Sequence, residues 1–275
     1  MSKLLPIFLL IAAPAAVAAT LPAGNPVPGG IAVVPLPENA TRASYNGNRV
    51  MVISHNGRRY AVVGVPLDTP SGKQTLTTST ADGERTVPFT VQSKTYATQR
   101  LTIKNKSLVT LSADDLKRVR RERKIIDAVY DDWTPELYAT LPFSLPVQGV
   151  ESSPFGVKRI LNGKPRSPHS GIDIAAPAGT PVRAPADGVV AEVGDFFFNG
   201  NTVILNHGEG LVSVYVHLGK IGVHEGEHVK RGQVIAQVGS TGRTTGADLH
   251  WTVTLNGTKI NPELLLSNTA LESLR

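Results

Sequence analysis

The chain has 275 residues, 41% of them hydrophobic and 18% charged, so it can bury a core in one large or two modest domains. It contains no cysteine, which excludes disulfides, a thiol nucleophile and a cysteine-ligated metal site. Its formal net charge of +6 suits an acidic polymer or a membrane surface, although charge alone identifies neither.

The first residues have the pattern of a secretory signal peptide. A short basic segment precedes an apolar run from Leu4 to Val17, and small residues follow as far as Ala19. The run is shorter than the roughly 18 apolar residues of a spanning helix, and it contains two prolines. We therefore predict a cleaved signal over residues 1–19, no membrane span, and a periplasmic or secreted protein.

Residues 20–110 are predicted to form a small all-β domain of the β-sandwich type. Short apolar runs are separated by turn signals such as Asn46-Gly47, Asn56-Gly57 and Asp82-Gly83. The expected strands are 31–36, 48–55, 58–67, 85–92 and 96–105.

An amphipathic helix is predicted over 113–133, within a linker of residues 111–140. Ser112 and Asp115 have the spacing of a capping box, and Pro135 ends the pattern. The segment 117–124 carries six cations, which form either a solvated helix face or a contact with anionic cell-wall polymer or lipid. Apolar residues recur at helical spacing at Leu116, Val119, Ile126, Val129 and Trp133.

Residues 141–275 are predicted to form a second, larger β domain. Runs of alternating apolar residues resume at 180–196, 201–208, 211–218, 228–239 and 250–257. A helix is expected only near the end of the chain, at 262–274.

Three pairs of polar residues in this second domain have a spacing that suits a metal or acid–base site. His169 and Asp173 are four residues apart, whereas Asp248 and His250 are two apart. Side chains alternate along a strand, so each pair points to one face. Tyr215 and His217 form the third pair. Each pair alone is common in structural strands, but together they offer the two imidazoles and the carboxylate of an open zinc site.

The order of these motifs resembles the lysostaphin-type (LytM-like) zinc metallopeptidases. The resemblance rests on SSPFGVKRILNGKPRSPHSGIDIAAPAGTPVRAPADGVV, then NTVILNHG, VYVHLGKI and GRTTGADLHW, and it covers residues 145–266. It implies an antiparallel β-sheet domain with one zinc ion in an open groove, which hydrolyses peptide cross-links of peptidoglycan. It also implies peptide stems as the partner and no nucleic acid.

By the same resemblance, His169, Asp173 and His250 are the zinc ligands and His217 is a catalytic residue. The chain departs from the family at Asp248, where the motif usually has a second catalytic histidine. Asp248 would then act as the general base, with His217 stabilising the oxyanion, or it would only orient His217 for proton transfer.

The sequence leaves two other functions open. One is a catalytically impaired relative that binds peptidoglycan or activates another cell-wall hydrolase. The other is a biotinyl or lipoyl carrier, because APADGVVAEVG and VKRGQVIAQVG are similar to carrier strands. A carrier needs an exposed lysine at a hairpin tip, and this chain has no such lysine motif. The endopeptidase is preferred because all three implied ligands are present.

Overall fold

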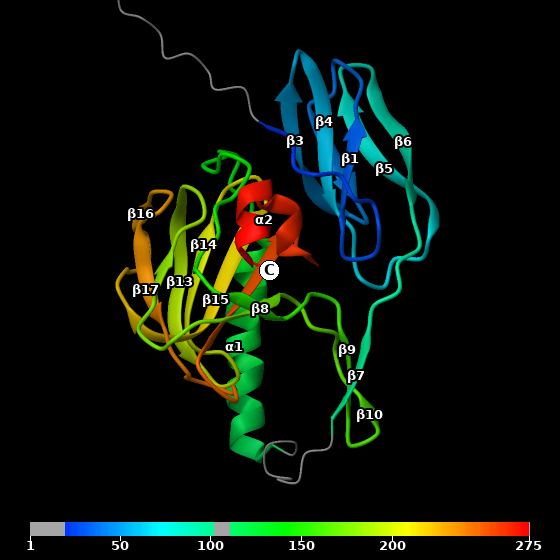
Figure 1. Ribbon diagram of the computed structural model, residues 1–275. Helices are drawn as coiled ribbons and strands as arrows, with labels where there is room; N and C mark the ends of the chain where they lie inside the picture. Colours follow the sequence, from blue (N-terminus) through cyan, green and yellow to red (C-terminus); the bar gives the residue numbers. More distant parts are fainter. Residues whose placement is uncertain (1–19, 102–110, 275) are drawn as a thin grey trace, which may run out of the picture.

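The computed structural model describes residues 20–101 and 111–274, and these are mostly β with antiparallel sheets, as predicted (Figure 1). The predicted signal peptide, residues 1–19, lies outside the described residues. Within those residues, no helix has both the length and the apolar character needed to cross a membrane.

The first part of the chain forms a six-stranded antiparallel sheet in the order β1-β4-β3-β2-β5-β6. The sheet curls so that β1 contacts β6, and its inner side chains form one apolar cluster that includes Val34, Tyr45 and Leu76. Asn46 and Asn56 adopt left-handed backbone at the predicted hairpin turns. The strands are β1 (Ile31–Pro35), β2 (Arg42–Tyr45), β3 (Asn48–His55), β4 (Arg58–Gly64), β5 (Gly72–Thr80) and β6 (Gly83–Val91).

The strand predicted at 96–105 has a different partner from the other strands before the helix. The described portion, β7 (Thr98–Leu101), pairs in parallel with β9 (Lys158–Leu161), which in turn pairs with β10 (Lys164–Pro165). This small sheet connects the segment before the helix to the segment that follows it. Residues 102–105 of the predicted strand lie outside the described residues.

The second part of the chain is built on a ten-stranded sheet whose main path is β16-β13-β14-β15-β18-β11-β8. All of its pairings are antiparallel, and β12, β17 and β19 attach to the sides of this path. The strands are β8 (Val150–Ser153), β11 (Ile172–Ala175), β12 (Pro181–Arg183), β13 (Gly188–Phe196), β14 (Gly200–Asn206), β15 (Leu211–Ile221), β16 (His228–Val229), β17 (Val234–Val238), β18 (Asp248–Leu255) and β19 (Thr258–Ile260). The chain ends in a short 3-10 helix, η2 (Pro262–Leu265), and α2 (Asn268–Leu274).

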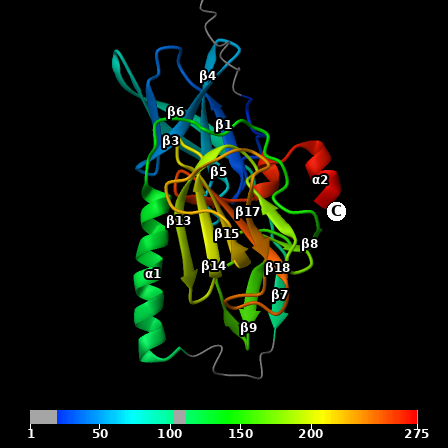
Figure 2. The ribbon, with the colours of Figure 1, turned by 90° about the vertical axis from the view of Figure 1, so that its left-hand side faces the viewer.

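Helix α1 (Ala113–Asp131) begins with the predicted capping box, in which Ser112 and Asp115 exchange backbone and side-chain hydrogen bonds. It packs on one face of β14 and β15 through Ile126, Val129 and Tyr130. Figure 2 shows it running alongside β13 and β14. The helix therefore covers part of one face of the large sheet, and the opposite face is turned to the main core.

The main core joins the two parts of the chain. Met51 and Ile53 of β3 belong to the same buried cluster as Trp251 and Leu255 of β18. A polar contact lies beside this core, where the buried Asn256 side chain accepts a hydrogen bond from the Gly64 backbone N–H at 2.8 Å. The six-stranded sheet thus packs directly on the frame of the large sheet.

His207 follows β14, and it is fully buried. Its Nδ1 lies 2.7 Å from the Asp187 carbonyl oxygen, which can only accept a hydrogen bond, so Nδ1 carries the hydrogen. Its Nε2 lies 2.7 Å from the Ser213 hydroxyl oxygen. Burial lowers the pKa of His207 to about 4, although the Asp187 carbonyl acts in the opposite direction.

This pKa predicts acid sensitivity. Between pH 6.5 and 4 the unfolded chain binds a proton at His207 that the folded chain does not bind, so stability falls as the pH falls through this window. The full contribution is on the order of 3 kcal/mol. We expect His207→Gln to be less stable at pH 7 but to lose less stability than wild type between pH 7 and pH 4, measured by urea unfolding with a chelator present. The control is His224→Gln at an exposed histidine. Equal pH dependence in the two variants would contradict the prediction.

Candidate metal and catalytic site

Strands β11 and β18 bring together the three residues predicted to be metal ligands. Asp173 of β11 is the direct cross-strand partner of His250 in β18. His169 lies in the segment before β11, and its backbone N–H and carbonyl bond to Val157 and Gly156. The sheet register and this backbone anchor place the three side chains at one position.

The three side chains point at a common centre. One ligand atom from each residue lies within 4.8 Å of the others. Asp173 Oδ1 is 3.0 Å from His169 Nε2 and 2.6 Å from His250 Nδ1, and the two ring nitrogens are 3.0 Å apart. His169 is buried, and the other two are partly buried. Separations of this size suit three donors around one cation.

Outer contacts orient both imidazoles. His169 Nδ1 donates to the Pro154 carbonyl oxygen at 2.8 Å, which leaves a lone pair on the inward-facing Nε2. His250 Nε2 lies 2.9 Å from the Thr252 hydroxyl, so its Nδ1 can likewise face inward as an acceptor. Such second partners are typical of metal-binding histidines.

The electrostatics also favour the ligand forms. Burial alone would raise the pKa of the Asp173 carboxyl, but protons on the facing nitrogens of His169 and His250, whose place a bound cation would take, outweigh burial and lower that pKa. Burial lowers the pKa of His250 against the opposing effect of Asp173. An anionic carboxylate and neutral imidazoles are the forms that bind metal. Three inward lone pairs need a positive charge between them, so this donor set fits a metal ion.

His217 lies at the end of the β15 segment that pairs with β18, and its ring centroid is 6.3 Å from that of His250. Its Nδ1 donates to the Thr241 carbonyl oxygen at 2.9 Å, which leaves Nε2 as the free acceptor. Its backbone is left-handed, with φ of 62°, a conformation that is uncommon outside glycine. The fold thus holds an imidazole in a strained conformation beside the ligand set.

A close backbone approach holds Thr241 against His217. Gly200 begins β14 and Gly242 lies in the loop before β18. A Cβ atom on Gly200 would lie 2.4 Å from the Gly242 nitrogen, so a side chain there would force the two backbones apart. The Thr241 hydroxyl also accepts from the Asn201 N–H and donates to the Leu218 carbonyl. The glycine-rich loop is therefore fixed next to the site.

Asp248 is partly buried and has the same strand alternation as His250, with Leu249 buried between them. Its Oδ1 accepts a hydrogen bond from the Thr244 hydroxyl at 2.9 Å. Among the described residues, no hydrogen bond joins Asp248 to His217, and the Thr241 carbonyl is the acceptor that orients the His217 ring. Asp248 is also outside the group of convergent ligand atoms.

Sequence reasoning did not find the residues that support the site. The contributions of Pro154 and Thr241 are backbone carbonyls, which leave no side-chain signal. Thr252 could have been found, because it follows His250 by two residues and therefore lies on the same face of β18.

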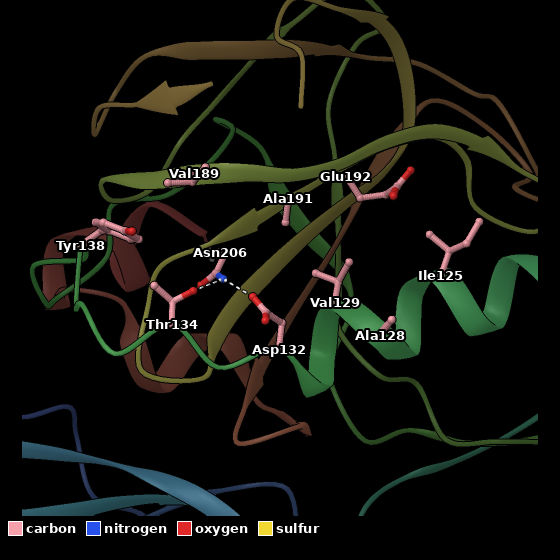
Figure 3. Close-up of a pocket in the computed structure, with 10 residues that line it drawn as sticks. All are labelled: Ile125, Ala128, Val129, Asp132, Thr134, Tyr138, Val189, Ala191, Glu192 and Asn206. Carbon is pink, nitrogen blue, oxygen red and sulfur yellow. Dashed lines mark hydrogen bonds between the residues drawn. The ribbon is translucent and has the colours of Figure 1, made fainter. Parts of the chain in front are cut away.

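A separate cavity of about 650 Å³ lies between α1 and β13 (Figure 3). Val129, Tyr138 and Glu192 are among its lining residues, and none of the candidate ligands lines it. At one end, the Asn206 amide donates to Thr134 at 2.9 Å and to Asp132 at 3.3 Å. The cavity therefore lies at the packing interface of helix α1 with the large sheet and is separate from the candidate metal site.

Comparison with known proteins agrees with this geometry. The model of peptidase family M23 matches residues 167–262, and that of the M23 N-terminal domain matches residues 24–94. A crystal structure of a peptidase M23 protein from Pseudomonas aeruginosa is 42% identical, with a TM-score of 0.76 over 89% of this chain and 96% of that chain. The chain belongs to peptidase family M23. The predicted resemblance to lysostaphin-type peptidases is confirmed, and family membership indicates a hydrolase.

Two curated relatives match over shorter stretches of the chain. The DD-carboxypeptidase/endopeptidase Mpg of Neisseria meningitidis serogroup B is 46% identical over 111 residues, which are 40% of this chain and 26% of that protein. The peptidoglycan DD-endopeptidase ShyA of Vibrio cholerae is 43% identical over 95 residues, 34% of this chain and 22% of that protein. This chain therefore spans about a quarter of the length of each of these relatives.

The donor geometry predicts how variants of this M23 protein bind metal. We expect chelator-stripped protein to bind about one equivalent of cobalt(II), measured by calorimetry and visible absorption. Asp173→Ala and His250→Ala each remove a donor and should lose this binding. Asp248→Ala should retain it, because Asp248 contacts Thr244 rather than the ligand atoms. Loss of metal from Asp248→Ala alone would show that Asp248 is a ligand.

Proposed function

We propose that this protein is a zinc-dependent endopeptidase that hydrolyses peptide cross-links of bacterial peptidoglycan. The observation that carries the proposal is the convergence of His169, Asp173 and His250 beside the oriented imidazole of His217. Family membership supports peptide hydrolysis, and the names of the curated relatives support peptidoglycan as the substrate. These relatives are much longer, so their activities enter only as support for the proposal.

Zinc is the metal that this donor set suits. Two imidazoles and one carboxylate form a common three-ligand set for catalytic zinc, with a fourth position left for water or substrate. When bound, zinc supplies a Lewis acid that polarises a peptide carbonyl and makes water more acidic.

His217 is placed to assist at the scissile carbonyl. Because the Thr241 carbonyl fixes the hydrogen on Nδ1, Nε2 is the nitrogen that can exchange a proton. The protonated ring donates from Nε2 to the developing oxyanion, and the neutral ring accepts there.

Asp248 is the candidate general base. Adjacent residues on one face of a strand lie about 7 Å apart, so its carboxylate is near the metal centre without being a ligand. The Thr244 hydroxyl occupies one side of the carboxylate and leaves other lone pairs free to accept a proton. We assign proton abstraction to Asp248 and oxyanion stabilisation to His217.

The aspartate at position 248 also suggests a second candidate function. The family motif usually has histidine at the position of Asp248, so this chain could be an impaired relative that binds peptidoglycan or activates another hydrolase. The endopeptidase is preferred because the ligands, their outer contacts and His217 are all in place.

We further propose that the protein acts outside the cytoplasm. The pattern of residues 1–19 supports export, and peptidoglycan lies in that compartment. The formal charge of +6 suits an acidic polymer. We expect no nucleic acid as a partner.

The proposed function predicts cleavage of cross-linked muropeptides by the zinc-loaded protein, with loss of activity on zinc removal and recovery on its return. His217→Ala should lower kcat by about 10²–10³-fold, the usual range for a lost oxyanion donor. Mass spectrometry of the muropeptides identifies the bond that is cleaved. If the zinc-loaded wild type cleaves no cross-link across a range of pH and salt, the binding function replaces the enzymatic one.

Asp248 variants separate the two candidate functions. We expect Asp248→Asn, which keeps the shape but removes the proton acceptor, to lower kcat by about 10²–10⁴-fold while zinc remains bound. Asp248→His restores the usual family residue and is the matched comparison. If wild type and Asp248→Asn are equally inactive and Asp248→His cleaves, the natural protein is the impaired relative.

A further inference from the structure

Three arginines gather beside the candidate metal site. Arg159 lies on β9, and the Arg166 backbone N–H bonds to the Arg159 carbonyl at 2.8 Å, which joins them at the base of the β9–β10 hairpin. Arg243 comes from the loop before β18. The pKa of the Arg243 guanidinium is lowered by partial burial and then by the charges of Arg166 and Arg159. The geometry agrees, because the loop of Arg243 bonds to His217 through Thr241 and Arg159 lies 3.6 Å from Asp173, so both elements border the candidate metal site.

These charges are poorly neutralised by the protein. Among the described residues, Arg159 forms an ion pair only with Asp173, whose Oδ2 is 3.6 Å from Nη2 and whose Oδ1 faces the other candidate ligand atoms. The Arg159 Nε is buried and has no hydrogen-bond partner. Within 20–101 and 111–274, no ion pair joins Arg166 or Arg243 to a carboxylate. A buried, unpaired guanidinium donor is costly unless an anion completes it.

Arg243 is also held in place. Its guanidinium carbon lies 4.2 Å from the centroid of the Phe198 ring, and its backbone N–H bonds to the Phe198 carbonyl. The planar fork of an arginine that is fixed in this way is suited to a carboxylate. Three cations, one with an unpaired donor and one held in place, suit the binding of an anion.

The position of the arginines selects the anion. Arg159 is within 4 Å of a metal ligand, so a bound anion lies close to the scissile bond. In a D-alanyl–diaminopimelate cross-link, the carbon that carries the scissile nitrogen also carries a free carboxylate. A terminal D-alanyl-D-alanine has the same arrangement. A glycine bridge lacks it, because the corresponding carboxyl group is part of the next amide.

We propose that Arg159, Arg166 and Arg243 bind a free carboxylate on the substrate residue that carries the scissile nitrogen, and so select such cross-links over glycine bridges. This inference rests on the proposed endopeptidase function. Arg159 and Arg243 contact this carboxylate from opposite elements, and Arg166 adds charge.

The test uses two muropeptide dimers that differ only at this carboxylate, which is free in one and amidated in the other. Binding is measured by calorimetry with the zinc-loaded full chain carrying His217→Ala, so that hydrolysis is slow. We expect the free carboxylate to bind at least tenfold more tightly. Adding Arg166→Gln and Arg243→Gln together should remove this preference.

The matched control is Lys158→Gln. Lys158 is exposed and directly precedes Arg159 in β9, so strand alternation points it to the other face. It should keep the preference for the free carboxylate. The inference would be overturned if the protein with all three arginines bound both dimers equally well. It would also be overturned if Lys158→Gln lost the preference as fully as the double arginine variant.

Cleavage by the chain with His217 intact is scored separately. Cleavage of both dimers at equal kcat/KM would support the endopeptidase and overturn carboxylate selection. Retained binding preference without any cleavage would support the carboxylate site and contradict the endopeptidase. Zinc content, measured for every variant, checks that the metal site is intact.

Discussion

The rest of the site depends on one constraint: three acceptor atoms from different residues are held close together and face one another. His169 Nε2, His250 Nδ1 and Asp173 Oδ1 lie within 3.0 Å of one another, and outer partners occupy the far nitrogens of both rings. Their lone pairs would repel one another in a dry site without a cation. A rigid frame is therefore needed to hold them together, and a metal ion is the natural stabiliser.

The ten-stranded sheet supplies that rigidity. Cross-strand pairing aligns Asp173 with His250, and the next strand aligns Val216 with His250 on the other side. Val216 belongs to the cluster beneath α1, so the helix and the ligands use neighbouring parts of one sheet face. The opposite face, with Leu249 and Trp251, is sealed in the core that also includes the first sheet. Ligand geometry is thus coupled to packing across most of the chain.

Much of this could be predicted from local patterns, and the exceptions have physical causes. Alternation in β18 predicted that Asp248 and His250 share a face, and the capping box predicted the start of α1. The helix ends at Asp131, two residues before the predicted end, because the cap at Asp132 closes it ahead of Pro135. Strand β5 was missed because its sequence is rich in threonine and has one apolar residue, Leu76.

Long-range pairing was harder to predict. Strand β7 looked like a continuation of the first β region, but it pairs with β9 some 60 residues later, and no local pattern encodes that choice. The pairing of β11 with β18 was not predicted; the sequence indicated only that His169, Asp173 and His250 could form one metal site. The arginine cluster was missed for the same reason, since Arg159 and the loop of Arg243 are about 80 residues apart and border one site only in the folded protein.

The loop before β18 positions the residues around the site that are not candidate metal ligands. The Thr241 carbonyl fixes the His217 ring, Arg243 lies on Phe198 next to the other arginines, and the Thr244 hydroxyl holds Asp248. One glycine contact, Gly242 against Gly200, fixes the loop to the strand beside it. The Asp248 carboxylate therefore bonds within this loop and lies outside the group of convergent donor atoms. The loop positions Asp248 independently of His169, Asp173 and His250, so its role can differ from theirs.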